Sequence, residues 1–286
     1  MILLAMLLAL GAERLLSSHR RGGSADPVLA RLWPRLPAPL RRFAGTPWLL
    51  ALAAALLVGG LAWQLHVALL ELAFSAAVLL VCFGPRDLAD DVQRLRAARS
   101  AGDAATVTRL SRVLQLGPMP DADHRSLLGA LFIQSHERRF GACLWFMLLG
   151  PAGAVLYRIA SRMAVLIDEP AARRQAALLH GLLAWLPARI TALLFGMAGS
   201  MDDALDAFGR VQREPVAGDD GWQQRSWSLL AETANAALDW EDAPGSGPMI
   251  ASSLDATLAE VLRMETRATL ILLALVAMFS AGAWVS

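Results

Sequence analysis

Hydrophobic residues gather in long blocks along this chain, and polar stretches separate them. The blocks of membrane-helix length lie near residues 1–18, 46–83, 141–157, 181–199 and 267–285. A single helix over 46–83 would be about 57 Å long, whereas the hydrocarbon core of a bilayer is about 30 Å thick. This block therefore predicts two helices, about 48–63 and 67–83. The pattern predicts an all-α, polytopic membrane protein in which residues 1–286 form a single membrane domain.

Two polar stretches lie between these blocks and also follow a helical pattern. Residues 85–140 repeat apolar side chains at a helical spacing and break at Gly102-Asp103, which predicts a helical hairpin. The repeating residues are Leu88, Val92, Leu95 and Ala98, then Val107, Leu110, Val113 and Leu114. Residues 200–266 are polar and helical around a Pro/Gly-rich loop. We expect both stretches to be helical insertions in the membrane domain.

The connector at residues 18–46 sets the expected orientation. It carries six arginines against a single acid, Asp26. Basic loops stay on the cytoplasmic side of the membrane, so this connector and the insertion 85–140 are predicted to be cytoplasmic. Reporter fusions at Asp26 and Asp103 should both report the cytoplasm, and a periplasmic signal at either would overturn this topology.

Helix breakers interrupt two of the apolar blocks, and each break lies near an arginine. Lipid cannot satisfy open backbone groups, so a broken helix at membrane depth must face protein or a water-filled cavity. We therefore expect broken or re-entrant helices that line a polar pocket. The candidate pocket residues are Gly150, Pro151, Gly153, Tyr157, Arg158, Pro187 and Arg189.

Arginine at such a pocket favours a phosphate or carboxylate ligand, because the guanidinium fork matches both groups. We expect both arginines to face inward, with Glu13 and Glu71 as intramembrane acidic partners. A purely structural interpretation stays open for each feature. Small residues let transmembrane helices approach closely, Tyr157-Arg158 can anchor a helix end at the interface, and Arg189 can form a structural ion pair. We expect His136 and Arg139 at a solvated helix start.

Composition narrows the chemistry. A net charge of +1 argues against a nucleic-acid partner. All 26 basic residues are arginine, which excludes lysine Schiff bases and Walker-type phosphate loops. Cys82 and Cys143 lie in apolar segments and are expected to be small buried hydrophobic residues. We expect no metal site, no cofactor and no catalytic residue of a standard motif, and membrane lipid as a partner.

Three motifs resemble one known superfamily. The stretch HERRFGACLWFMLLGPAGAVLYR at 136–158, the stretch WLPARITALL at 185–194 and GPRDL at 84–88 are similar to AmpE/CobD/CbiB proteins. The resemblance implies a multi-pass protein of the bacterial inner membrane. It covers two branches. CobD/CbiB proteins act in cobalamin synthesis and form an amide between a corrinoid carboxylate and an aminopropanol compound. AmpE proteins are inner-membrane regulators linked to the amidase AmpD and to β-lactamase induction.

The chain departs from the synthase branch at three places. The first helix reads GAERLL where synthases carry an Asp-rich element, residues 159–163 lack an Asn-Thr-Leu-Asp-type run, and residues 180–184 lack an acidic pair and an asparagine. An amide-forming enzyme needs acidic or amide groups to handle metal or amine. We therefore interpret the chain as an AmpE-type signalling protein in cell-wall stress rather than an enzyme. A CobD/CbiB-like synthase is the alternative, and a small-molecule transporter is third.

Overall fold

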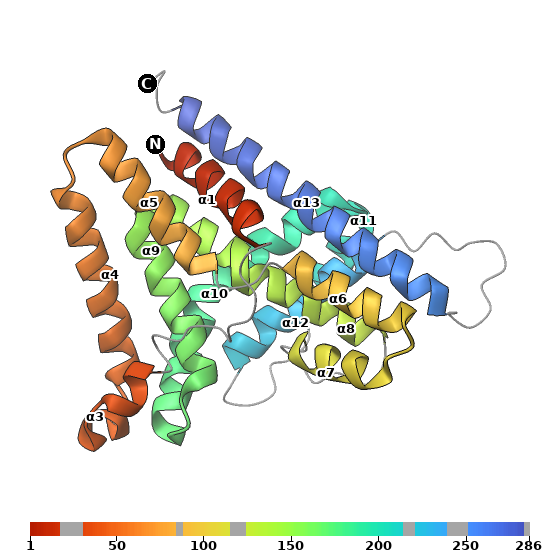
Figure 1. The fold of residues 1–286 in the computed structure, drawn as a ribbon, viewed down its shortest axis with the longest axis horizontal. Helices are drawn as coiled ribbons and strands as arrows, with labels where there is room; N and C mark the ends of the chain where they lie inside the picture. The colour runs from red at the N-terminus through yellow and green to blue at the C-terminus, as the bar shows by residue number, and fades with distance from the viewer. Residues whose placement is uncertain (18–30, 84–87, 115–123, 214–220, 239–250, 283–286) are drawn as a thin grey trace.

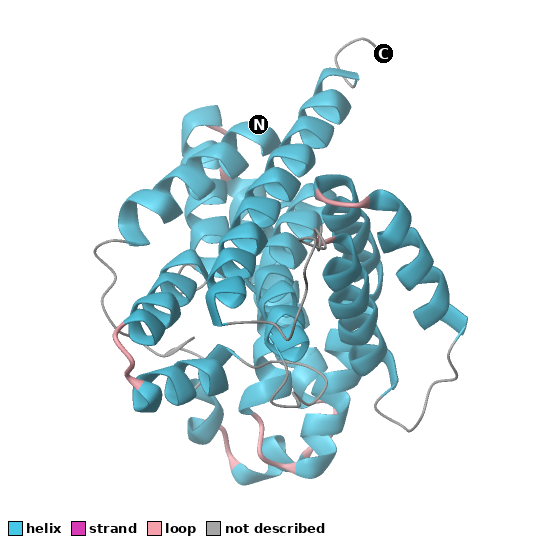
Figure 2. Cartoon of the chain, turned by 90° about the vertical axis from the view of Figure 1, so that its right-hand side faces the viewer, coloured by secondary structure: helices cyan, strands magenta, loops and turns pink. Residues whose placement is uncertain are grey.

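Helices make up the whole described architecture. The computed structural model describes residues 1–17, 31–83, 88–114, 124–213, 221–238 and 251–282, and this part of the chain contains helices and short loops but no strand (Figures 1 and 2). The elements are α1 (Ile2–Ser17), η1 (Trp33–Arg35), α3 (Ala38–Arg42), α4 (Thr46–Gln64), α5 (Ala68–Phe83), α6 (Leu88–Ser100), α7 (Ala104–Leu114), α8 (His124–Ser135), η2 (His136–Phe140), α9 (Gly141–Leu166), α10 (Pro170–Ala198), α11 (Met201–Arg213), α12 (Gly221–Ala237) and α13 (Ala251–Gly282). The predicted all-α fold class is confirmed.

Four helical runs in the described residues are long and apolar enough to cross a membrane. They are Thr46–Gln64, Ala68–Ser100, Leu127–Leu166 and Pro170–Ala198. The first run, α4, turns a row of leucines outward, including Leu49, Leu52 and Leu56. Because a bilayer core is as apolar as these side chains, their exposure indicates a face in contact with lipid. The predicted insertion 85–140 ends inside the third run, and the motif residues 84–87 lie outside the described residues.

The last helix begins earlier than predicted. The apolar block indicated a helix over 267–285, but α13 starts at Ala251 and includes the polar stretch before it. Leu254, Leu258 and Val261 in that stretch are buried. Their spacing of three to four residues continues the apolar stripe of one helix backwards. Mean hydropathy over a window underestimates the length of such a helix, because its outer face is polar.

The hairpin of α6 and α7 matches the predicted period. Leu88, Val92 and Leu95 are fully buried, whereas Val113 is exposed. Gly102 makes the turn with a φ of 69°. Asp103 then caps α7 by accepting the backbone N–H of Thr106 at 3.0 Å, and the hydrogen bonds from Thr106 hold the pKa of its carboxyl below the usual value.

Helix α9 bends sharply at Gly150, whose φ of 62° and ψ of −151° only glycine adopts readily. In a straight helix Gly141 and Tyr157 would lie about 24 Å apart. Instead the Tyr157 ring rests directly on Gly141, where a Cβ atom would overlap it. The two halves of α9 therefore fold toward each other, as the predicted break required.

Helix α10, in contrast, stays helical through Pro187. The expected break at this position is wrong. Proline has no N–H to donate to the carbonyl of Leu183 four residues earlier. The indole Nε1–H of Trp145 donates to that carbonyl instead, at 2.9 Å. A side chain from α9 thus supplies the missing hydrogen bond and lets α10 continue.

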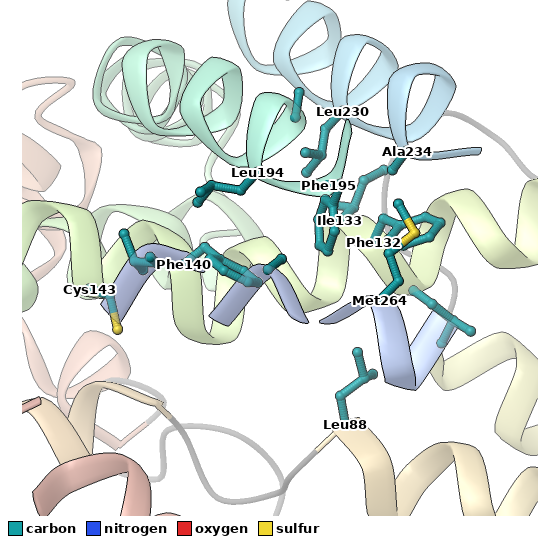
Figure 3. Close-up of a cluster of buried hydrophobic side chains, with 14 of the residues drawn as sticks. Leu88, Phe132, Ile133, Phe140, Cys143, Leu194, Phe195, Leu230, Ala234 and Met264 are labelled. Carbon is teal, nitrogen blue, oxygen red and sulfur yellow. The ribbon is translucent and has the colours of Figure 1, made fainter. Parts of the chain in front are cut away.

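The main hydrophobic core lies where α8 and η2 meet α10, α12 and α13 (Figure 3). Phe195 of α10 stands at its centre, with ring centroids 4.9 Å from Phe132 and 5.4 Å from Phe140 in edge-to-face geometry. Cys82 and Cys143 are buried free thiols, as predicted. Because this core surrounds η2, the charged residues of η2 are enclosed in the protein.

Candidate functional site

The charged run His136–Arg139 forms most of a five-residue π-helix, η2, inside the long helical run from α8 to α9. Such widened turns are rare and occur frequently at functional sites. His136 is completely buried, and Glu137 and Arg139 are less than a tenth exposed. The prediction that His136 and Arg139 begin a solvated helix is therefore wrong. Helix α8 before them is itself core, with Leu128, Leu131 and Phe132 buried, so the run starts in the interior.

Glu137 accepts three hydrogen bonds from three different helices. Tyr157 Oη of α9 lies 3.1 Å and His180 Nε2 of α10 lies 3.0 Å from its Oε2. Trp227 Nε1 of α12 lies 2.9 Å from its Oε1. A buried carboxylate is costly unless it is hydrogen-bonded, and these three donors occupy both of its oxygens.

The hydrogen bonds continue on both sides of Glu137. Gln223 Nε2 of α12 lies 2.7 Å from His180 Nδ1. At the other end, His136 Nε2 lies 3.1 Å from Tyr157 Oη, and its Nδ1 lies 3.0 Å from Thr191 Oγ1. We name the seven residues His136, Glu137, Tyr157, His180, Thr191, Gln223 and Trp227 the Glu137 network.

One set of proton positions satisfies every bond in this network. The Gln223 amide donates to His180 Nδ1, so the proton of His180 sits on Nε2 and points at Glu137. Tyr157 donates to Glu137 and therefore accepts from His136 Nε2–H. His136 Nδ1 then accepts the Thr191 hydroxyl. In this arrangement a continuous hydrogen-bonded chain runs from the core at Thr191 to the partly exposed Gln223.

The two arginines of η2 make separate ion pairs. Arg139 lies 3.2 Å from Glu13 of α1 and 2.9 Å from Glu265 of α13. Arg138 lies 2.9 Å from Asp91 of α6. Four consecutive side chains therefore reach α1, α6, α9, α10, α12 and α13. This run connects most of the fold, and any chemistry at Glu137 is built on that framework.

The predicted pocket residues fall into two groups, one on α9 and one on α10. Gly150, Pro151 and Gly153 form the bend of α9, and Tyr157 joins the Glu137 network. Tyr157 and Arg158 are both buried, so the interpretation of this pair as an interfacial anchor is wrong. They lie in the middle of the second half of α9, which continues to Leu166.

Arg189 belongs to a different environment. Its guanidinium lies 4.1 Å from the Trp185 ring centroid and donates to the Trp185 carbonyl at 2.8 Å, one turn earlier in α10. Glu13 contacts Arg139, and Glu71 is exposed in the first turn of α5. A ligand pocket shared by Arg158, Arg189 and these acids stays a prediction.

Sequence reasoning missed the chemistry of Glu137, His180, Gln223 and Trp227. A run of six polar residues, QSHERR at 134–139, is typical of a solvated segment when it is taken alone. The apolar stretches LLGALFI before it and FGACLWF after it carried the opposite signal. Ionisable residues inside an apolar block mark a buried site, and the same rule that singled out Arg189 applies to Glu137. Among the described residues, no group of three or more histidine, cysteine or acidic side chains is arranged to hold a metal ion.

One comparison links the chain to a known protein. The protein named "Cobalamin biosynthesis protein CobD" from Chromobacterium violaceum is 32% identical over 152 residues. The match covers 48% of this chain and 47% of the relative, so the chain spans about half the length of the curated relative it matches. No family model and no solved structure matches. The match supports membership in the AmpE/CobD/CbiB superfamily, and it does not favour the AmpE branch.

Proposed function

We propose that the chain is a bacterial inner-membrane enzyme of the CobD type, which joins a corrinoid carboxylate to an amine. The Glu137 network is its acid–base centre. The observation that carries this proposal is the pairing of Glu137 with His180 at 3.0 Å, inside a network that ends at the partly exposed Gln223. A carboxylate that orients a histidine is a common arrangement for a general base.

The three departures from the synthase pattern argued against this function. They removed acidic and amide groups at three particular places in the sequence. The Glu137 network supplies an acid, two imidazoles and a side-chain amide at other places, within one hydrogen-bonded chain. The chemical objection therefore loses its force, and the CobD-named relative favours the enzyme over the regulator.

His180 offers a specific place for the amine. Its Nδ1 accepts an N–H from Gln223, so a substrate ammonium that displaced this amide would donate to the same atom. His180 would take the proton, while Glu137 stabilised the resulting imidazolium through its 3.0 Å contact with Nε2. The free amine then attacks the carbonyl carbon of a carboxylate that has been activated as an acyl phosphate by a nucleoside triphosphate. The carbon–oxygen bond to the phosphate breaks, and the departing phosphate carries away that oxygen and the remaining amine proton.

The regulatory interpretation remains the second candidate. It rests on the same three departures, which leave the chain without elements that the resemblance assigns to synthases. It would link the chain to AmpD and to β-lactamase induction, with an anionic ligand in the membrane pocket. The two proposals differ in whether the Glu137 network turns over a substrate.

Complementation separates them. The chain should restore corrinoid-dependent growth to a bacterial strain that lacks its own CobD-type synthase, and Glu137→Gln should fail although it reaches the membrane at a similar level. Loss of a general base or its partner lowers rates about 10²- to 10⁴-fold. Asp206→Asn is the matched control, because Asp206 is an exposed carboxylate in α11 that belongs neither to the Glu137 network nor to the predicted pocket.

A second measurement covers the regulator. The gene should be deleted in its own host and assayed for β-lactamase induction and for corrinoid synthesis. A change in induction with normal corrinoid synthesis, together with failed complementation, would replace the enzyme with the AmpE-type role. Detection of the amide product with purified protein would exclude that outcome.

A further inference from the structure

A cavity of about 410 Å³ opens between η1, the start of α4 and the end of α9, and none of its lining residues belongs to the Glu137 network. Nine of its ten lining side chains are apolar, and the tenth belongs to Arg35. Its volume falls within the range of about 300–1,000 Å³ that is usual for small-molecule sites. An apolar cavity with a single cation at its edge suits an amphipathic anion.

The cavity lies near one end of the candidate membrane spans. Leu50 and Ala54 line it from α4, which begins at Thr46, so they sit about 6 and 12 Å along that helix. Met163 and Leu166 line it from the last turn of α9. Figure 1 shows α3, the start of α4 and the end of α9 at the same end of the molecule. A bilayer crossed by α4 from Thr46 onward would place the cavity near the boundary between its acyl chains and its headgroups.

Basic residues surround this end of the spans. Residues 31–46 contain four arginines and no acid, and residues 168–175 contain two arginines and two acids, which gives a net charge of +4 from six bases less two acids. One of the acids, Glu169, already has two partners in the protein. It accepts the Trp33 indole N–H at 3.0 Å and lies 3.5 Å from Arg41. Trp33 is thereby fixed in the cavity wall, as is common for tryptophan at a membrane interface.

We propose that this cavity holds one acyl chain of an anionic phospholipid, with the lipid phosphate at Arg35. The apolar walls accept the acyl chain, and the net positive charge of residues 31–46 and 168–175 selects an anionic headgroup. Cytoplasmic leaflets attract juxtamembrane basic segments by the same charge complementarity. The proposal is independent of the enzyme or regulator assignment, because it uses none of the residues of the Glu137 network.

Native mass spectrometry of delipidated protein tests it, with dioleoyl phosphatidylglycerol and dioleoyl phosphatidylcholine as probes. One basic contact near a membrane surface is worth about 1 kcal/mol, which corresponds to about fivefold in affinity. The wild type should therefore bind phosphatidylglycerol at least about fivefold more tightly. Arg35→Gln should lose most of this preference. Ala54→Trp, which fills the cavity, should weaken both lipids, and Leu50→Phe serves if that variant does not fold.

Arg112→Gln is the matched control, because Arg112 is an exposed arginine on α7, far along the chain from the cavity. It should keep the wild-type preference. The proposal is overturned if Arg35→Gln keeps the preference, if the control loses it equally, or if the folded cavity-filling variants bind both lipids normally. Complete displacement of phosphatidylglycerol by millimolar inorganic phosphate would also overturn it, because free phosphate competes only for Arg35 and cannot displace an acyl chain from the apolar walls.

Discussion

Replacing Glu137 tests whether the buried hydrogen-bond network is as complete as its geometry indicates. Glu137→Ala removes the acceptor of three buried or partly buried donors, those of Tyr157, His180 and Trp227. An unsatisfied buried polar group costs about 1–3 kcal/mol. Three unsatisfied donors would together lower the free energy of unfolding by about 3–9 kcal/mol. This range is an upper bound, because the substitution also removes a carboxylate that is costly to bury. Against a typical total of about 5–15 kcal/mol, this is a large share of the stability.

Glu137→Gln should have a graded effect. Its one carbonyl oxygen can replace Oε2 and keep the hydrogen bonds of Tyr157 and His180. Its NH₂ group then faces the indole N–H of Trp227, which produces one donor–donor conflict. The expected cost is about 1–3 kcal/mol. Adding Trp227→Phe removes the facing donor, so the double variant should lose less stability than the sum of the two single variants.

Thermal unfolding of the purified protein in detergent measures this series. The midpoint should fall from wild type to Glu137→Gln and further to Glu137→Ala. Asp206→Asn should stay within about 0.5 kcal/mol of wild type, because Asp206 is exposed in α11. An alanine variant that unfolds at the wild-type temperature would refute the network. So would a glutamine variant as unstable as the alanine variant, because the shared oxygen would then contribute nothing.

Two further substitutions probe how α10 continues through Pro187 and how the two halves of the bent α9 pack together. Trp145→Phe should lower the free energy of unfolding by about 1 kcal/mol, because it leaves the Leu183 carbonyl, which Pro187 cannot reach with an N–H, without its donor. In a Pro187→Ala background a backbone N–H is available again, so the same substitution should cost less. Equal losses of stability in both backgrounds would contradict this role of Trp145. Gly141→Ala should destabilise the protein by about 1–3 kcal/mol, because the added methyl group collides with the Tyr157 ring. Gly11→Ala is the control and should be neutral or stabilising, because open space surrounds Gly11. Equal thermal midpoints for these two variants would contradict the close approach of Tyr157 to Gly141.

Local pattern predicted much of the fold because helix period and block length are properties of short segments. The spacing of Leu88, Val92 and Leu95 predicted the buried face of α6 correctly. The bend at Gly150 also followed from the sequence, since a Gly-Pro pair interrupts a helix wherever it stands. Pro187 shows the limit of this rule. Whether a proline ends a helix depended on Trp145, a residue 42 positions away that no local window contains.

The sequence by itself determined the helices, their apolar lengths and the presence of ionisable residues within them. Only the tertiary structure decided which of those residues meet. Glu137 contacts His180 and Trp227, which are 43 and 90 residues away in the chain, and Arg139 contacts Glu265 at a separation of 126. Charge, period and spacing are encoded locally, but the partners of a buried carboxylate are set by the way in which α9, α10 and α12 pack around it. That packing depends on the fit of all the apolar faces together, because no short segment carries the information alone.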